Sequence, residues 1–118
     1  MLEIIENTNN LLYVKASGEV TAADYETVLI PAAENILKEH DKLRMIYELG
    51  PEMTGFSAGA MWEDAKVGMN HLTQFEKLAV ISDHGWIVNM VKVFAFMIPC
   101  PVKVFSVAQA AEARTWIG

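Results

Sequence analysis

The sequence predicts an α/β fold with a mixed, mainly parallel sheet of about five strands and four helices, in the order β-β-α-β-α-β-α-β-α. After an opening hairpin, strand-like and helix-like segments alternate along the chain, which is typical of right-handed crossovers between parallel strands. The run from Leu78 to Ile81 is apolar without interruption, as expected for a strand covered on both faces. Capping boxes at Thr21 with Asp24 and at Ser106 with Gln109 mark the starts of two helices.

The first third of the chain predicts a hairpin followed by a long helix. The strands run from Leu2 to Ile5 and from Leu11 to Ala16, and the asparagines between them favour a turn because Asn tolerates left-handed conformations. Gly18 ends the hairpin. The helix then extends from Thr21 to about Glu39, with apolar residues at helical spacing. Pro31 falls inside this pattern, so we expect a kink there.

The middle of the chain predicts a strand, a loop and a second helix. The strand runs from Leu43 to Leu49, and the loop contains Gly50, Pro51 and Gly55. Ser57 is a good N-cap for the helix that follows, from Ala58 to Leu72. We expect one stripe of this helix to face the core (Ala58, Met61, Trp62, Ala65, Met69 and Leu72) and another to face water (Glu63, Lys66 and Asn70).

A third helix, from Trp86 to Ile98, is the most apolar segment of the chain. Only Asn89 and Lys92 interrupt its apolar character. As a helix it is roughly 20 Å long, against about 30 Å for the hydrocarbon core of a bilayer, so it does not span a membrane. Its apolar arc is wider than one sheet covers, so the surplus must contact another helix, a second subunit, a ligand or a membrane surface.

The end of the chain predicts one more strand and one more helix. Pro99 and Pro101 stop the apolar helix, and Val102 to Phe105 forms the strand. The closing helix carries its apolar residues at Ala110, Ala113 and Trp116.

Length and composition indicate a single domain over residues 1–118. The chain is 53% hydrophobic and has a formal net charge of −6 without a basic cluster, which disfavours nucleic-acid binding and electrostatic docking on anionic lipid. Cys100 is the only cysteine, which excludes an intrachain disulfide and favours a reducing compartment. The first ten residues contain two glutamates and no basic residue, unlike a signal peptide. We therefore expect a cytoplasmic protein whose membrane contact, if any, is hydrophobic and peripheral.

Several residues at matching places resemble the SpoIIAA-like family. The likeness is carried by Asp24-Tyr25 with Pro31, the segment GFSAGAMWEDAK from Gly55 to Lys66, the segment FEKLAVISD from Phe75 to Asp83 with Trp86, and Phe105 with Ala113 and Trp116. These are bacterial proteins of about this length, related in fold to the anti-sigma-factor-antagonist (STAS) domains. The fold is also similar to the lipid-binding CRAL-TRIO type. The resemblance therefore implies an apolar ligand or membrane association.

Ser57 is a regulatory candidate on the strength of this resemblance. STAS domains carry a phosphorylatable serine at the start of the helix after the third strand, usually within Asp-Ser-Ser-Gly. Here the corresponding region, from Met53 to Ser57, reads Met-Thr-Gly-Phe-Ser, and that pattern is absent. The alternative is that Ser57 serves only as an N-cap.

No catalytic or metal-binding motif of comparable strength is present. Asp83-His84-Gly85 follows a buried strand, where open α/β sheets bind ligands, but adjacent Asp and His rarely orient each other as in a triad with Ser57. His40, His71 and His84 lack metal-binding spacing. We therefore expect no cofactor and no metal, and a hydrolase is the least favoured alternative.

Methionine and tryptophan side chains gather on the two helices that flank the Leu78 to Ile81 strand. They predict either a plain helix–helix core or an adaptable apolar pocket, because methionine suits irregular apolar sites. Asn89 and Lys92 would offer polar groups to a carboxylate or a lipid headgroup. The candidate ligand-binding residues are Met61, Trp62, Met69, Trp86, Asn89, Met90, Lys92 and Met97. Phe96, in the polar stripe, is the candidate contact of a twofold homodimer.

The sequence thus predicts a non-enzymatic binding protein for a small apolar or amphipathic, lipid-like ligand, compatible with reversible membrane association. The alternative is a STAS-type protein-interaction module with Ser57 as phosphoacceptor.

Overall fold

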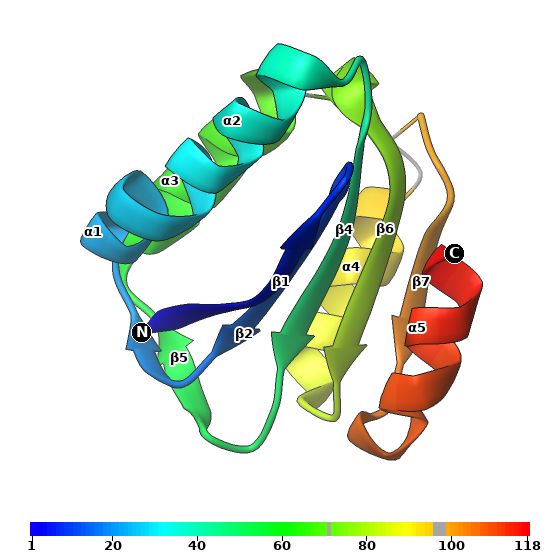
Figure 1. Cartoon of the computed structure of the whole chain (residues 1–118). Coiled ribbons are helices and arrows are strands. Elements are labelled where there is room, and N and C mark those ends of the chain that lie inside the picture. The colour runs from blue at the N-terminus through cyan, green and yellow to red at the C-terminus, as the bar shows by residue number, and fades with distance from the viewer. Residues whose placement is uncertain (71, 96–98) are drawn as a thin grey trace.

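A five-stranded sheet with helices on both faces forms the body of the molecule (Figure 1). The computed structural model describes residues 1–70, 72–95 and 99–118, without the side chains at 65, 67–70, 72 and 94. The strands are β1 (Leu2–Thr8), β2 (Leu11–Ala16), β3 (Gly18–Val20), β4 (Leu43–Leu49), β5 (Met53–Phe56), β6 (Phe75–Ser82) and β7 (Val102–Phe105). The helices are α1 (Ala22–Asp24), the π-helix η1 (Tyr25–Leu29), α2 (Ile30–Glu39), α3 (Ala58–Asn70), the 3-10 turn η2 (Leu72–Gln74), α4 (Gly85–Phe94), the 3-10 turn η4 (Val107–Gln109) and α5 (Ala110–Ile117).

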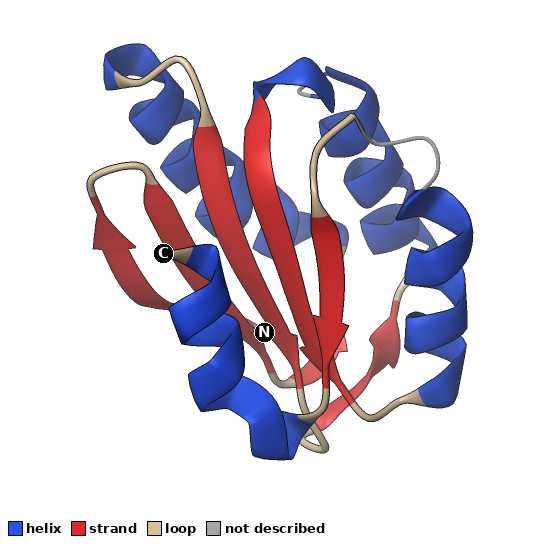
Figure 2. Ribbon diagram, turned by 90° about the vertical axis from the view of Figure 1, so that its right-hand side faces the viewer, coloured by secondary structure: helices blue, strands red, loops and turns tan. Residues whose placement is uncertain are grey.

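The main sheet has the strand order β1-β2-β4-β6-β7. β1 pairs with β2 antiparallel, and every other neighbour pair in this sheet is parallel. The crossovers advance across the sheet in one direction, which brings α2, α3 and α4 to the same face. Figure 2 shows α5 in front of the strands, on the opposite face. The mixed, mainly parallel α/β architecture predicted from the sequence is confirmed.

Each face of the sheet has its own apolar core. On one face, side chains of the strands pack with Ala33 of α2, Ala60 of α3 and Ile87 of α4. On the other face, the strands pack with Ala113 and Ile117 of α5. The central strands thus contribute alternate side chains to the two cores, as a sheet covered on both faces requires.

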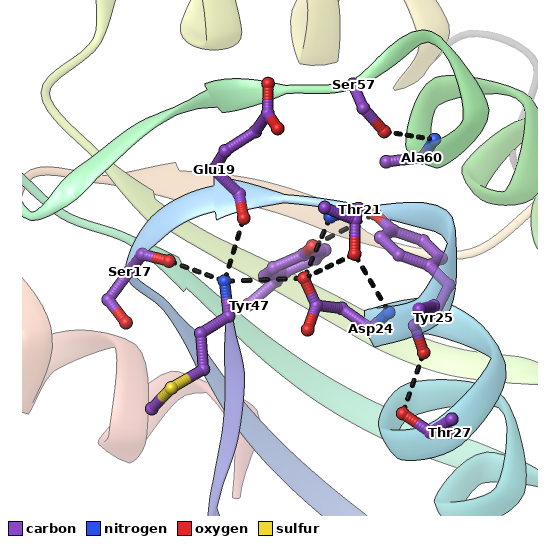
Figure 3. Close-up of polar contacts among 11 residues, drawn as sticks. Ser17, Glu19, Thr21, Asp24, Tyr25, Thr27, Tyr47, Ser57 and Ala60 are labelled. Atoms are coloured by element: carbon purple, nitrogen blue, oxygen red, sulfur yellow. Dashed lines mark hydrogen bonds and ion pairs between the residues drawn. The ribbon is translucent and has the colours of Figure 1, made fainter.

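The first helix begins at the predicted capping box and widens before Pro31. The Asp24 amide donates to Thr21 Oγ1 at 3.3 Å, and the Thr21 amide donates to Asp24 Oδ2 at 2.8 Å (Figure 3). The next turn is a π-helix, in which the Ile30 amide donates to the Tyr25 carbonyl. Pro31 has no N–H and its ring crowds the preceding turn, which favours the wider π-helix found there. The predicted kink at Pro31 stays a prediction.

Two short strands were not predicted from the sequence. β3 and β5 pair parallel to form a second, two-stranded sheet beside the end of β2. Gly18, predicted to end the hairpin, begins β3 with a left-handed φ of 60°, and its amide donates to the Glu52 carbonyl at 2.7 Å. The predicted loop around Gly55 is therefore partly strand. Segments of three or four residues that contain glycine give too little alternation to be recognised.

The predicted core stripe of α3 was wrong. Ala60 and Glu63 are buried, whereas Met61 and Trp62 are exposed. The close approach of α3 to α1 contributes to this arrangement, because a Cβ at Gly59 would lie 3.1 Å from the Cβ of Ala22. Glu63, predicted to face water, forms an ion pair of 2.9 Å with Lys66. The predictions for the side chains of Ala65, Met69, Asn70 and Leu72 fall outside the described residues.

The predicted apolar helix from Trp86 to Ile98 is described as α4 through Phe94, and residues 96–98 fall outside the description. Across the described ranges, no helix is long and apolar enough to cross a membrane.

Candidate functional site

Among the described side chains, the large apolar ones that are exposed fall into two groups. One group lies at the start of the chain (Met1, Ile4 and Ile5). The other lies on α3 and α4, where the exposed fractions are 51% for Met61, 65% for Trp62, 47% for Trp86 and 66% for Val93. The spacing of Trp86, Met90 and Val93 places them on one stripe of α4, with Met90 half-buried. We call Phe56, Met61, Trp62, Trp86, Met90 and Val93 the α3–α4 apolar surface.

Phe56 connects the two helices of this surface. Its ring meets the Trp86 ring edge to face, with centroids 6.0 Å apart and planes at 89°. Phe56 directly precedes Ser57, whose Oγ accepts a hydrogen bond of 3.1 Å from the Ala60 amide and so caps α3 (Figure 3). Phe56 and Met61 consequently occupy the two positions of a hydrophobic staple at this helix start. The predicted N-cap role of Ser57 is confirmed.

A chain of three polar side chains runs from the core to the surface of α3. The hydroxyls of Tyr47 and Tyr25 lie 2.9 Å apart, and the Tyr25 hydroxyl donates to Asp64 Oδ1 at 2.8 Å. Both tyrosines are buried, and this burial raises the pKa of each hydroxyl. Asp64 is exposed as a whole residue, but the surrounding protein desolvates its carboxylate. This desolvation raises the pKa of Asp64, while the hydrogen bond from Tyr25 opposes the shift.

The tyrosine–aspartate chain was not predicted from the sequence. Tyr25 lies at helical spacing with the apolar residues of the first predicted helix, and a buried tyrosine needs a partner for its hydroxyl, which is the signal that points to such a chain. The partner itself was not identifiable, because Asp64 lies 39 positions further along the sequence.

The predicted ligand-binding residues form an open surface in the part of the chain that is described. Met61, Trp62 and Trp86 are exposed, Met90 is half-buried, and Asn89 and Lys92 are exposed. Their role in ligand binding stays a prediction. The side chain of Met69 and residues Phe96 and Met97 lie outside the described residues, so the predicted dimer contact at Phe96 also stays a prediction.

The family is settled by the match of a family model. The model of the SpoIIAA-like family matches residues 11–118. The chain belongs to the SpoIIAA-like family. Among solved structures, an uncharacterised protein with a SpoIIAA-like fold from Shewanella loihica PV-4 is similar to it, with a TM-score of 0.80 and 25% sequence identity over 100% of this chain and 93% of that chain. No curated protein matches the sequence. The family resemblance inferred from the residues is thus confirmed.

In this SpoIIAA-like chain, Ser57, Asp83 and His84 have separate partners. Ser57 Oγ binds the Ala60 amide, and His84 Nε2 lies 3.0 Å from the Gly50 carbonyl oxygen. Asp83 Oδ1 accepts from the Val107 amide at 3.3 Å, at the start of η4. Each of the three side chains therefore holds a loop or a helix end in place. The neighbouring Asp83 and His84 thus have structural roles and do not form a triad with Ser57. The described residues contain no group of three or more His, Cys, Asp or Glu side chains able to hold a metal ion.

A shallow hollow on the opposite face of the SpoIIAA-like domain lies between β7 and α5. It is lined by Lys103, Phe105, Ala111, Glu112, Thr115 and Trp116. Its rings contact each other, with the Phe105 and Trp116 centroids 6.0 Å apart, and Lys103 covers Phe105. The aromatic rings of this hollow therefore already have partners within the domain.

Proposed function

We propose that this SpoIIAA-like protein is a non-enzymatic binding protein that takes a small amphipathic, lipid-like molecule on the α3–α4 apolar surface. The observation that carries the proposal is the exposure of Met61, Trp62, Trp86 and Val93 on neighbouring crossover helices of one sheet face. Aromatic side chains bury about 150–250 Å² each when covered, so leaving two tryptophans exposed is unfavourable unless a partner contacts them.

The chemistry of the α3–α4 apolar surface favours an acyl-like ligand. Methionine side chains at Met61 and Met90 are flexible and polarizable, so they adapt to an irregular hydrocarbon chain. Tryptophan combines an apolar ring with one N–H donor and is suited to the boundary between hydrocarbon and water. Reversible contact with a membrane surface is compatible with this composition. The net charge of −6 makes such contact hydrophobic rather than electrostatic.

Tryptophan fluorescence and thermal unfolding test this proposal. Single-chain amphiphiles, added below their critical micelle concentrations, should change the emission and raise the melting temperature, since a ligand at one hundred times its Kd stabilises by about 2.7 kcal/mol. The three tryptophans provide an internal control, because Trp116 lies on the opposite face. Trp62→Phe or Trp86→Phe should reduce the fluorescence change, and Trp116→Phe should preserve it.

A matched pair of variants tests the location of the site. Met61→Asp places a charge on the α3–α4 apolar surface, and Ile5→Asp places one at a position of similar exposure on β1, 51% against 47%. Met61→Asp should abolish the melting-temperature shift caused by an uncharged amphiphile, since an unpaired carboxylate opposes apolar contact. Ile5→Asp should retain it. A panel without any shift, or equal shifts for both variants, would contradict the proposal.

A regulatory interaction module is the second candidate function. It is favoured by membership of the SpoIIAA-like family and by the position of Ser57 at the start of a 13-residue helix, where a phosphate is stabilised by the free backbone amides. Peptide mass spectrometry of the protein isolated from its own cells should then find phosphate on Ser57. Unmodified Ser57 under all growth conditions would remove this candidate.

A further inference from the structure

The hydrogen-bond direction within the tyrosine–aspartate chain follows from chemistry. An ionised carboxylate only accepts hydrogen bonds, so Tyr25 must donate its proton to Asp64 Oδ1. The Tyr25 oxygen is then free to accept, and Tyr47 is the donor across the 2.9 Å contact. Two buried tyrosines thus hold one oxygen of an accessible carboxylate in a fixed position.

The second oxygen of this carboxylate has no hydrogen-bond partner among the described residues. Within the described residues, Asp64 makes no ion pair, and the contact from Tyr25 uses only Oδ1. Lys66, on the same helix, is paired with Glu63 at 2.9 Å. A carboxylate offers about four lone-pair sites. Asp64 therefore presents a carboxylate held in a fixed position on an exposed residue, with unused acceptor capacity.

Asp64 adjoins the α3–α4 apolar surface. It follows Met61 by three positions, a spacing that makes the two side chains neighbours on a helix. Met61 in turn occupies the staple position relative to Phe56, which contacts Trp86. An acidic group beside exposed aromatic and thioether side chains is complementary to a cation attached to a hydrocarbon chain, since aromatic rings also attract ammonium groups.

We propose that the amphipathic ligand carries an ammonium headgroup, which Asp64 binds while the hydrocarbon chain lies along Met61, Trp62 and Trp86. This inference rests on the proposed function and specifies its ligand class. Tyr25 is a positioning residue, because its hydrogen bond fixes the carboxylate before binding and so reduces the entropy lost on association. Lys92, the group predicted to receive a carboxylate, is exposed on α4, and no hydrogen bond or ion pair holds it there among the described residues. Crowding raises the pKa of Asp64, and a bound cation would relieve this unfavourable desolvation.

Three probes with the same twelve-carbon chain separate the contribution of the headgroup to the affinity from that of the hydrocarbon chain. Dodecylammonium, dodecanoate and neutral dodecyl maltoside are titrated calorimetrically into the full-length protein below their critical micelle concentrations. The wild type should bind dodecylammonium most tightly. Asp64→Asn removes the charge and keeps an oxygen for Tyr25, so the fold is preserved. It should weaken dodecylammonium binding about fivefold, the order of an accessible ion pair, and leave dodecyl maltoside unchanged.

The control variant is Glu34→Gln, which removes an exposed carboxylate of α2 and alters the net charge equally. It should leave all three affinities unchanged. Equal weakening by Asp64→Asn and Glu34→Gln would mean that dodecylammonium responds only to net charge, and the inference would fall. Equal or tighter binding of dodecanoate by the wild type would also overturn it while leaving the proposed function standing. If none of the three probes binds, the proposed function itself fails, and the headgroup inference with it.

Discussion

Trp86 packs edge-on against Phe56, with ring centroids 6.0 Å apart and ring planes at 89°. This contact joins the first turn of α4 to the end of β5, two segments that the sequence analysis treated separately. It fixes one of the two exposed tryptophans in orientation, so the α3–α4 apolar surface has a rigid element beside its flexible methionines. An organised aromatic side chain loses little entropy when a ligand covers it, which favours binding.

Removing the Phe56 ring should release Trp86. We expect Phe56→Ala to lower the free energy of unfolding by about 1–3 kcal/mol, from lost apolar contact and the lost edge-to-face pair. The emission of Trp86, recorded in a protein that carries Trp62→Phe and Trp116→Phe, should shift to longer wavelength. Phe56→Leu keeps part of the apolar contact, so its stability and its emission maximum should lie between those of the wild type and Phe56→Ala. An unchanged emission maximum in Phe56→Ala would show that the ring contact does not control the environment of Trp86.

The two readings of Ser57 predict different responses to substitution. Ser57→Ala removes the acceptor for the Ala60 amide and should reduce stability by about 1 kcal/mol, measured by urea unfolding. Ser57→Asp keeps an N-cap acceptor and adds negative charge at a helix start, so its stability should match the wild type. A stable Ser57→Asp variant that changes partner binding would favour the regulatory candidate. Equal destabilisation by both substitutions would contradict the capping role.

The close packing of α3 on α1 predicts a strong effect at Gly59. A Cβ at this position would lie 3.1 Å from the Cβ of Ala22, so Gly59→Leu should force the two helices apart and cost about 1–3 kcal/mol. Gly85→Leu is the matched control, because a Cβ at Gly85 meets no atom within 4 Å. Thermal unfolding of both variants checks this prediction. Comparable melting temperatures for the two would mean that α1 and α3 are not in close contact.

The sequence predicted what local patterns determine. β2, β4 and β7 begin and end at the predicted residues, because each is a periodic or continuous apolar run between turn residues. The capping boxes at Thr21 and Ser106 were also predicted correctly, since both partners of each box lie within four residues.

Features that depend on tertiary contact were not predictable in the same way. The start of α3 approaches α1 closely at Gly59 and Ala22, and a helical wheel contains no information about that neighbour. The candidate site had the same difficulty. Met61, Trp62 and Trp86 were named as candidates from their residue types. Exposed and buried apolar residues look alike in sequence, so the exposure of these three side chains became evident only from the fold. Asp64 was overlooked because its partner Tyr25 comes from another helix.

The raised pKa of Asp64 predicts a specific dependence of stability on pH. Its ordinary value is 3.8, and desolvation raises the pKa in the folded protein. The folded state therefore holds this proton more tightly than the unfolded chain does, and the contribution of Asp64 to stability is greatest below pH 3.8. That contribution falls as the pH rises from 3.8 through the folded pKa, because the folded protein must then hold a desolvated charge. The amide of Asp64→Asn cannot ionise and escapes this loss.

The stability difference between Asp64→Asn and the wild type should consequently move in favour of the variant as the pH rises from acid to neutral. Urea unfolding at a series of pH values measures it directly. Glu34→Gln, at an exposed carboxylate of α2, serves as the control for the loss of one formal negative charge. Asp24 should behave in the opposite way, because the hydrogen bonds from Thr21 hold its pKa below the ordinary value of 3.8. Asp24→Asn should therefore lose stability relative to the wild type as the pH rises through the range below 3.8. A falling difference for Asp64→Asn over the same range would show that the bond from Tyr25 outweighs desolvation at this carboxylate.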